Sequence, residues 1–258
     1  MEPFKTVFED RESGTVAYLF IQTSPYNTLT GEQLFELKDT MYKLSEDSDL
    51  IVLTSENKKY FCNGLDPVYL LNASLEERTR TIGMMIEIIY DLYDLPVPYI
   101  AELTGHTVAG GFVISAPAEN RFMLNGEYLI GFSEIPVGLF LPSIYIEVVK
   151  DFVSPRFIRD VFEGKMFSPK EAQDVGIVDG VADSKDELRN MVLDRADKLL
   201  SLPKKAYLDS RLNLRRLKKE QLKRFLDSDR RILKPEVMEK EIPIVMQRIV
   251  EKVMNKKK

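Results

Sequence analysis

Residues 96–111 read PVPYIAELTGHTVAGG, and this stretch decides the fold class. Its residues 98–103 are mostly apolar and have the length of a strand that is buried on both faces. The glycine pair Gly110 and Gly111 follows, and the apolar run that begins at Phe112 can open a helix. A strand, a glycine turn and a helix in succession are typical of crossover units, whose strands lie parallel in one sheet.

The preceding segments repeat this alternation. Residues 16–22 and 50–54 are two more apolar, β-prone runs, which we interpret as buried strands. Between the strands, hydroxyl residues followed three positions later by Gln or Glu mark helix starts, because such pairs form capping boxes. These pairs are Thr30 with Gln33 and Ser74 with Glu77. Strands that alternate with helices predict an α/β fold.

Beyond residue 140 the pattern becomes helical. Ser168 and Glu171 form another capping box, Pro169 stands at the first helical position, and Gly176 ends that helix. The remaining predicted elements are a short strand at 177–181 and helices at 185–200 and 204–226.

Charge is distributed unevenly along the chain. Residues 201–258 carry 18 Lys or Arg against 8 Asp or Glu, a net charge of +10, whereas residues 1–200 carry 18 against 33, a net of −15. We therefore expect an α/β core at residues 1–200 and a basic helical region at residues 201–258. The whole chain has a net charge of −5, which argues against nucleic acid as a partner.

Composition excludes several classes of function. The chain has 258 residues, of which 44% are hydrophobic, so it can bury a core and is not globally disordered. A single cysteine, Cys62, excludes a disulfide scaffold and a cysteine-rich metal site. A single histidine, His106, excludes a pair of histidine ligands, and we expect no metal.

Neither the termini nor the apolar runs point to a membrane or an organelle. No run approaches the ~18–20 apolar residues of a membrane span. Residues 1–10 lack the features of a signal or transit peptide, and residues 255–258 do not form a peroxisomal tripeptide. We expect a soluble protein, cytoplasmic by default, with the mitochondrial matrix and the peroxisome left open.

Three segments carry residues suited to catalysis. In FCNGLD (61–66), a glycine after a strand lets backbone amides face a cleft. In GHTVAGGF (105–112), the unpaired N–H groups of a helix start suit a developing oxyanion. In IGFSEIPVGL (130–139), Glu134 is one carboxylate among apolar residues, and burial would raise its pKa toward neutral pH. Taken singly, such segments are more often a turn, a packing glycine pair and an exposed loop acid.

Four segments, taken in order, resemble the crotonase (enoyl-CoA hydratase/isomerase) superfamily. They are FCNGLD at 61–66, PVPYIAELTGHTVAGG at 96–111, GFSEIPVGL at 131–139 and MFSPKEAQDVGIVDGVA at 166–182. Residues 23–29, TSPYNTL, are similar to the N-terminal turn of that family. The resemblance covers about residues 14–182 and implies a ββα spiral core with a helical C-terminal region that drives trimerisation.

The resemblance also implies a site. The family polarises an acyl-CoA thioester carbonyl with two backbone N–H groups, which here belong to Leu65 and Gly110. Glu134 stands at the family's second acid position and is the implied catalytic residue. The residues expected to contact substrate are Phe61, Asn63, Gly64, Asp66, Gly111, Val113, Phe132 and Leu139, and those expected near the coenzyme A phosphates are Lys58 and Lys59.

The acids decide the reaction that the resemblance implies. Hydratases of the family hold a water molecule with two glutamates, and the first of these corresponds to Val113. Dienoyl-CoA isomerases keep acids at the positions of Val113 and Pro142. A single carboxylate suffices for a Δ3,Δ2-enoyl-CoA isomerase, which moves a proton from C2 to C4 of a 3-enoyl-CoA. The implied function is therefore this isomerisation, with Glu134 as the sole proton shuttle.

Other interpretations stay open. Hydration or hydrolysis of acyl-CoA fits the same fold, as does a non-catalytic module that binds acyl-CoA or protein. The implied partners are the acyl-CoA substrate and further copies of the chain, as a homotrimer or a dimer of trimers. No separate cofactor is implied, because coenzyme A is part of the substrate. RNA binding lacks the interleaved aromatic residues that it usually needs.

The basic residues of the C-terminal region also have two interpretations. They can neutralise coenzyme A phosphates, or they can form the solvated face of a helix, which is the commoner case. They are Arg211, Arg215, Arg216, Lys218, Lys219, Lys223 and Arg224. A stripe of leucines and one phenylalanine between residues 212 and 226 would serve packing or a subunit interface.

Overall fold

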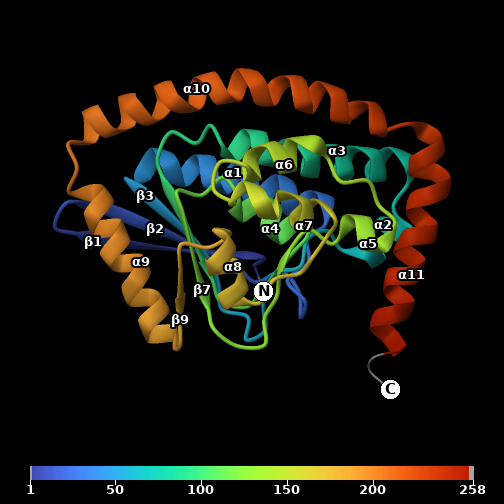
Figure 1. Ribbon diagram of the computed structural model, residues 1–258, viewed down its shortest axis with the longest axis horizontal. Coiled ribbons are helices and arrows are strands. Elements are labelled where there is room, and N and C mark those ends of the chain that lie inside the picture. The colour runs from blue at the N-terminus through green and yellow to red at the C-terminus, as the bar shows by residue number, and fades with distance from the viewer. Residues whose placement is uncertain (1, 256–258) are drawn as a thin grey trace.

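A six-stranded sheet forms the centre of the computed structural model, which describes residues 2–255 of the chain, and the side chains of 2–252 (Figure 1). Its strand order is β1-β2-β3-β5-β7-β9; β1 and β2 pair antiparallel and every later pair is parallel. The strands are β1 (Phe4–Arg11), β2 (Gly14–Ile21), β3 (Leu50–Ser55), β5 (Tyr99–Leu103), β7 (Asn120–Leu124) and β9 (Gly180–Ala182). The three strands predicted before residue 104 are confirmed as β2, β3 and β5.

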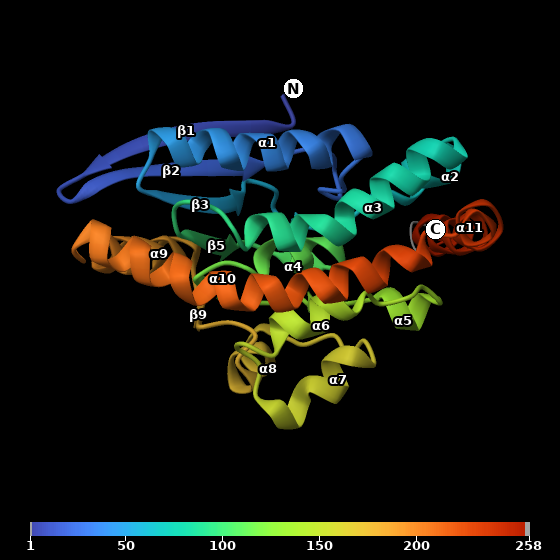
Figure 2. The ribbon, with the colours of Figure 1, turned by 90° about the horizontal axis from the view of Figure 1, so that it is seen from above.

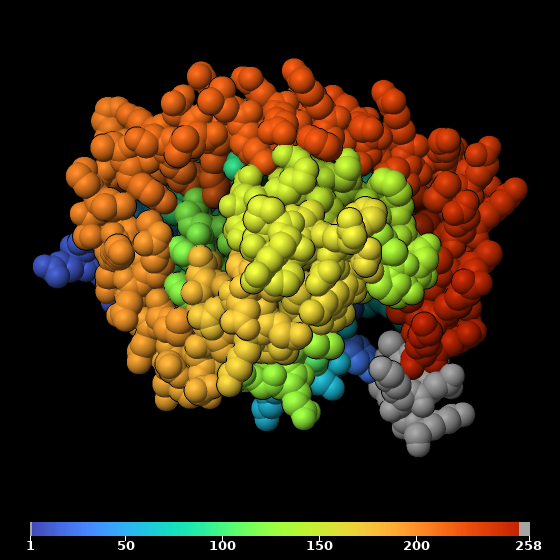
Figure 3. All heavy atoms as spheres, in the orientation of Figure 1, coloured from blue at the N-terminus to red at the C-terminus, as the bar shows by residue number. Residues whose placement is uncertain are grey.

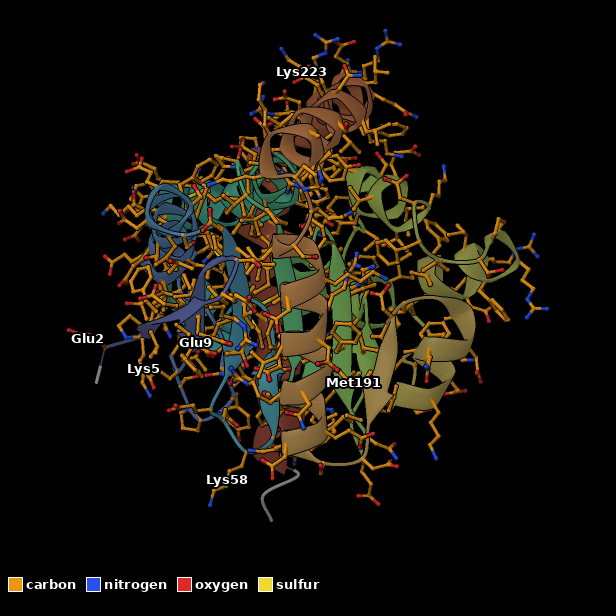
Figure 4. All side chains as sticks on the ribbon, turned by 90° about the vertical axis from the view of Figure 1, so that its left-hand side faces the viewer. Glu2, Lys5, Glu9, Lys58, Met191 and Lys223 are labelled. Atoms are coloured by element: carbon orange, nitrogen blue, oxygen red, sulfur yellow. The ribbon has the colours of Figure 1, made fainter. Side chains whose placement is uncertain are left out.

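Helices cover both faces of this sheet. α9 (Lys185–Leu200) packs Leu188 and Val192 against one face, and α1 (Gly31–Asp47) and α3 (Leu75–Leu92) pack against the other. Figure 4 shows α9 lying along the sheet, with Met191 on it. All three capping boxes predicted from the sequence are present. They form because a hydroxyl and a carboxylate or amide satisfy N–H groups that the first helical turn leaves unpaired.

A second, three-stranded parallel sheet consists of β4 (Tyr60–Cys62), β6 (His106–Val108) and β8 (Ile130–Gly131). Neighbouring parallel strands end at the same edge of a sheet. The loops that leave this edge are the three segments that sequence analysis selected, 61–66, 105–112 and 130–139. The small sheet therefore brings together motifs that lie about 70 residues apart along the chain.

Three short helices follow these loops directly, and further short helical elements lie between residues 143 and 175. The first three are α2 (Pro67–Asn72), α4 (Gly110–Ser115) and α5 (Glu134–Val137), and the others are α6 (Ser143–Val149), the 3-10 turn η1 (Pro155–Phe157), α7 (Ile158–Phe162) and α8 (Pro169–Val175). Gly176 ends α8 with a left-handed φ of 90°, as the sequence predicts.

The C-terminal third is helical, as expected. α10 (Lys204–Asp229) runs across the molecule, and α11 (Ile242–Asn255) then turns down beside α2 (Figures 1 and 2). Between them lie the 3-10 turn η2 (Arg230–Ile232) and the π turn η3 (Val237–Glu241). The expected boundary at residue 200 falls in the turn between α9 and α10. Residues 256–258, which belong to the segment judged for a peroxisomal address, lie outside the described residues.

The basic residues of α10 fall into two sets. Arg216, Lys223 and Arg224 form a solvated face, as one interpretation expects. In contrast, Arg211, Arg215, Lys218 and Lys219 pair with acids of the core, which neither interpretation foresaw. Arg211 and Arg215 donate to Glu119 at 2.5 and 2.7 Å, and Lys218 bridges Glu147 and Asp151. These ion pairs attach α10 to the acidic core. Lys223 remains exposed and projects outward (Figure 4). No helix in residues 2–255 is both long enough and apolar enough to span a membrane.

Candidate active site

The loops after β4 and β6 touch through two glycines. A Cβ atom at Gly64 would lie 2.8 Å from the amide nitrogen of Gly110, and one at Gly110 would lie 2.9 Å from the Cα of Gly64. Gly64 also has a φ of +77°, which L side chains rarely adopt. Close approach explains why both positions need glycine. It also brings the peptide groups of Leu65 and Gly110 close to each other.

The N–H groups of Leu65 and Gly110 are free to bind a ligand. Among the described residues, neither group donates to a backbone or side-chain acceptor, whereas Asp66 N donates to Leu29 O and Ala109 N to Gly131 O. Gly110 is the first residue of α4, where no intrahelical acceptor exists. Two neighbouring donors that face one cavity can stabilise a developing oxyanion.

Ala109 holds this turn in a strained conformation. Its φ is 51° and its ψ is −120°, in a region that alanine rarely occupies. Such strain costs about 1–3 kcal/mol and persists where the surrounding structure imposes it, often at functional sites. The surrounding structure therefore fixes the shape of the loop that leads into Gly110.

Glu134 is the first residue of α5 and enters the same region from the loop after β8. The residue is half-buried overall, but its Oε2 is shielded from solvent and has no hydrogen-bond partner among the described residues. Burial raises the pKa of the carboxyl from 4.5 to about 7, against a smaller opposing effect from the backbone amides of Glu134 and Ser133. A carboxyl with that pKa can both accept and return a proton near neutral pH.

An aromatic stack lies behind Glu134. Phe132 packs between Phe112 and Tyr145, with ring centroids 4.6 and 5.5 Å away. The Tyr145 hydroxyl donates to Met85 O at 2.8 Å, so it is already engaged. Burial, and next the negative charge of Glu134, raise the pKa of Tyr145. The stack thus supplies apolar surroundings for the carboxyl.

One cavity connects these groups. Its volume is about 530 Å³, and Leu65, Gly110 and Glu134 all line it. Most of the other lining residues are apolar, and many come from α2, α3, η3 and α11. Figure 3 shows the C-terminal segment, in red, lying directly against the yellow-green segment that carries α5. The cavity is therefore a mostly apolar chamber that the two free amides and the proton-carrying acid line, together with the polar residues Asn63, Ser133 and Glu241.

The structure separates the residues expected to contact substrate into four groups. Asn63 and Leu139 line the cavity, as does Pro142, an acid position in dienoyl-CoA isomerases. Gly64 and Gly111 serve close packing, since a Cβ at Gly111 would overlap the Cys62 carbonyl. Those that lie in the core outside the cavity are Phe61, Val113 and Phe132. Asp66 caps α2 by accepting from Val68 N and Tyr69 N at 2.8 and 2.9 Å.

The remaining sequence candidates lie away from the cavity. Lys58 and Lys59 are exposed, and Lys58 points away from the molecule in Figure 4. His106 accepts from Leu129 N at Nδ1 and packs against Tyr60, and burial lowers its pKa. Cys62 is fully buried, which raises the pKa of its thiol to about 12. His106 and Cys62 therefore have packing roles.

Sequence reasoning missed three residues that shape the site. Glu241, in the π turn η3, is a second acid that lines the cavity. Asp229 accepts from Ser143 N and Ile144 N at 3.0 and 2.9 Å and so caps α6, which carries Tyr145. Arg78 is buried between α2 and η3. Within residues 2–252, no group of three His, Cys, Asp or Glu side chains could hold a metal ion.

Comparison with known proteins decides the family. The family model described as enoyl-CoA hydratase/isomerase matches residues 11–256. The chain belongs to the enoyl-CoA hydratase/isomerase family. The crystal structure of human mitochondrial delta3-delta2-enoyl-CoA isomerase superposes with a TM-score of 0.87 and 24% identity, covering 98% of this chain and 99% of that one. The predicted crotonase-type fold is thereby confirmed.

Two curated relatives of this enoyl-CoA hydratase/isomerase family are named enoyl-CoA delta isomerases. Enoyl-CoA delta isomerase 2, peroxisomal, of Arabidopsis thaliana is 30% identical over 144 residues, which span 53% of this chain and 60% of the relative. Enoyl-CoA delta isomerase 1, mitochondrial, of Mus musculus is 26% identical over 203 residues, which span 77% and 70%. An enoyl-CoA hydratase from Bacillus anthracis shares the fold at a TM-score of 0.72 and 18% identity, covering 87% of this chain and 90% of that one. Structures named as isomerases and structures named as hydratases therefore share this fold, so the fold does not distinguish the two activities.

Proposed function

We propose that the protein is a Δ3,Δ2-enoyl-CoA isomerase. The supporting observation is the combination of one buried carboxyl, Glu134, with the free N–H groups of Leu65 and Gly110 around a single apolar cavity. The delta isomerases among its relatives point the same way.

In the proposed mechanism, the thioester oxygen accepts hydrogen bonds from the N–H groups of Leu65 and Gly110. Glu134, as carboxylate, removes a proton from C2 of the 3-enoyl-CoA. The electron pair delocalises onto the oxygen, and the two amides stabilise this enolate; each such donor contributes about 3 kcal/mol in other oxyanion holes. Glu134 then returns the proton to C4, which leaves the double bond between C2 and C3, conjugated with the thioester.

The apolar surroundings favour proton transfer over water addition. Val113 is buried in the core where family hydratases have their first glutamate, and Pro142 faces the cavity. Neither side chain can orient a water molecule. Exclusion of water also strengthens the interaction of the amides with a developing charge.

The test is conversion of 3-hexenoyl-CoA to the conjugated 2-enoyl-CoA, followed by absorbance and product analysis. We expect turnover by the wild type and a loss of at least about 10³-fold in Glu134→Gln, since both proton transfers need this carboxyl. Glu36→Gln, an exposed acid on α1, is the matched control. Equal rates in the wild type and Glu134→Gln would reject the proposed role. Release of free coenzyme A would indicate hydrolysis instead.

Hydration is the second candidate, and Glu241 favours it. Its side chain lines the cavity with Glu134, so two carboxylates could hold a water molecule. Glu241 is exposed, however, and lies on a different element from the first acid of family hydratases. Incubation with trans-2-hexenoyl-CoA separates the candidates: a 3-hydroxyacyl product that disappears in Glu241→Gln would establish hydration.

We also propose that Lys58 and Lys59 contribute to coenzyme A binding. Both lysines are exposed next to the loop that carries Gly64. Reversal of both lysine charges should raise KM in a salt-dependent way.

We further propose that the chain forms a homotrimer or a dimer of trimers. Three leucines on α10 are exposed and could serve the subunit interface: Leu212, Leu214 and Leu217. Analytical ultracentrifugation of the wild type and Leu214→Asp tests the assembly.

A further inference from the structure

Arg78 on α3 is a buried cation whose charge is held by backbone carbonyls. Its side chain is 7% exposed. Nε donates to Leu70 O at 2.9 Å and Nη2 donates to Ala73 O at 2.8 Å, at the end of α2. Nη1 donates to Met238 O at 2.8 Å, across 160 positions of sequence. No carboxylate within residues 2–252 forms an ion pair with it.

The Met238 carbonyl needs this donor because of Pro243. In the π turn η3, backbone N–H groups donate five positions back, and Ile242 N donates to Val237 O. The next donor in that pattern would be residue 243, which is proline and has no N–H. The widened turn also relieves the clash that a proline ring causes in an α-helix. One carbonyl is thus left without an intrahelical partner, and Arg78 satisfies it.

Arg78 therefore joins two elements that wall the cavity. α2, η3 and α11 share an apolar cluster of Leu70, Met238, Ile242, Val245 and Met246. Each of these five residues also lines the cavity. The same cluster packs against Leu65 and Leu139, which border the proposed thioester site. The cluster forms an apolar wall that starts at the reacting groups and continues along the C-terminal helix.

We propose that Arg78 is a positioning residue that fixes the π turn over the cavity, and that this turn with α11 determines the length of acyl chain the enzyme accepts. The inference rests on the proposed function and extends it to the length of the apolar tail that the substrate carries. In the proposed mechanism the first carbons of the acyl chain lie at the two amides and Glu134, so the part of the wall that continues along α11 would contact the more distant methylenes. Every methylene that the wall covers adds to affinity through apolar burial.

Binding of unreactive saturated thioesters tests the inference separately from turnover. The probes are butanoyl-, octanoyl- and dodecanoyl-CoA, measured by calorimetry. Arg78→Met keeps the apolar stem and deletes the donors, and Arg80→Met, an exposed position on the same helix, is its control. Met246→Trp narrows the cavity directly, and Ile244→Trp, which is exposed on α11, is the control for bulk.

We expect wild-type affinity to increase with chain length. Both Arg78→Met and Met246→Trp should lower the ratio of dodecanoyl-CoA to butanoyl-CoA affinity by about tenfold or more, because they weaken binding of the long chain far more than binding of the short one. Isomerisation of 3-enoyl-CoA substrates should show the same dependence on chain length, as a KM that rises much more for long chains than for short ones. Arg78→Lys should recover only part of the ratio, because one ammonium cannot span carbonyls in three directions.

Several results would overturn the inference. Equal weakening of all three probes in Arg78→Met would indicate a merely structural arginine. An unchanged ratio in Met246→Trp would remove the wall from the acyl path, and this variant decides the matter if Arg78→Met fails to fold. Wild-type binding that does not depend on chain length would reject the inference and leave the proposed isomerase intact. Absence of any acyl-CoA binding by the wild type would instead reject the proposed function.

Discussion

Gly64 and Gly110 lie in backbone contact, so that a Cβ atom on either residue would approach the main chain of the other to within 3 Å. This contact positions two peptide N–H groups from loops that are 45 residues apart in the sequence. The side chains on these loops matter less than the shape of the backbone. The two glycines therefore permit the donor pair because they have no Cβ atom, which would push the two loops apart.

Gly64→Ala and Gly110→Ala should abolish most of the turnover. A methyl group at either position must push the loops apart, and the loss of one donor costs about 3 kcal/mol, or more than 100-fold in rate. Gly83→Ala, in the interior of α3, is the control, since its Cβ would meet only Leu233 Cδ1 at 3.3 Å. Steady-state rates on 3-hexenoyl-CoA measure the effect, and near-wild-type rates in both glycine variants would contradict it.

The pH profile should report the pKa of Glu134. Its raised value of about 7 implies that the free enzyme is half protonated near neutral pH. Because the first step needs the carboxylate, kcat/KM should rise with pH up to about 7 and then level off. A flat profile between about pH 5 and pH 8 would show that the carboxyl titrates at its ordinary value or does not act as the base.

The same buried carboxyl should make the protein less stable as pH rises. The folded chain binds this proton up to about pH 7, whereas the unfolded chain releases it near pH 4.5. The contribution of this carboxyl to the free energy of unfolding is therefore fully present below pH 4.5 and is lost as pH rises through 7. At about 1.4 kcal/mol per pKa unit, the free energy of unfolding falls by about 3 kcal/mol in total. Glu134→Gln should therefore be more stable than the wild type at pH 8 and equally stable at pH 4.5, as measured by denaturant unfolding. A difference that is the same at both pH values would point to packing instead.

Local signals made much of the fold predictable from the sequence. The bounds of α9 match the prediction of 185–200, and the capping boxes at Thr30, Ser74 and Ser168 are all present. Caps and helical spacing depend on residues within one or two turns, so a single sequence reveals them. The three strands of the small sheet have only two or three residues each, too few for a period, so they were not predicted from the sequence. Only the segments around them were selected, through their glycines and Glu134.

The rest of the site depends on contacts that no local pattern contains. Asp229 caps α6 across 86 positions, and Arg78 reaches Met238 across 160. Glu241 lines the cavity because Pro243 induces a π turn and α11 folds back on α2. The pairing of the basic α10 with acids of the core was also hidden, although the opposite net charges of the two regions are consistent with it.

Ala109→Gly should stabilise the protein, against the usual effect of adding glycine. Glycine adopts a φ of 51° without strain, and relief of about 1–3 kcal/mol exceeds the 0.4–1 kcal/mol of unfolded-state entropy that glycine adds. We expect a net gain of about 1 kcal/mol in the free energy of unfolding. Ala206→Gly, at an exposed helical position of α10, is the control and should lose about 1 kcal/mol. A loss at both positions would mean that the backbone of Ala109 is not strained.

Asp229→Ala should lower both stability and turnover, because Asp229 fixes the helix that walls the cavity. Both of its carboxylate oxygens accept N–H groups of α6, and Oδ1 also accepts from Ser143 Oγ at 2.7 Å. Loss of such a cap costs about 1–2 kcal/mol. Tyr145 would then pack less tightly near Glu134, so we expect kcat to fall while KM changes little. Asp227→Ala, exposed two residues earlier, is the control and should change neither property. A variant that loses stability but keeps its full kcat would show that the cap supports the fold without positioning the catalytic wall.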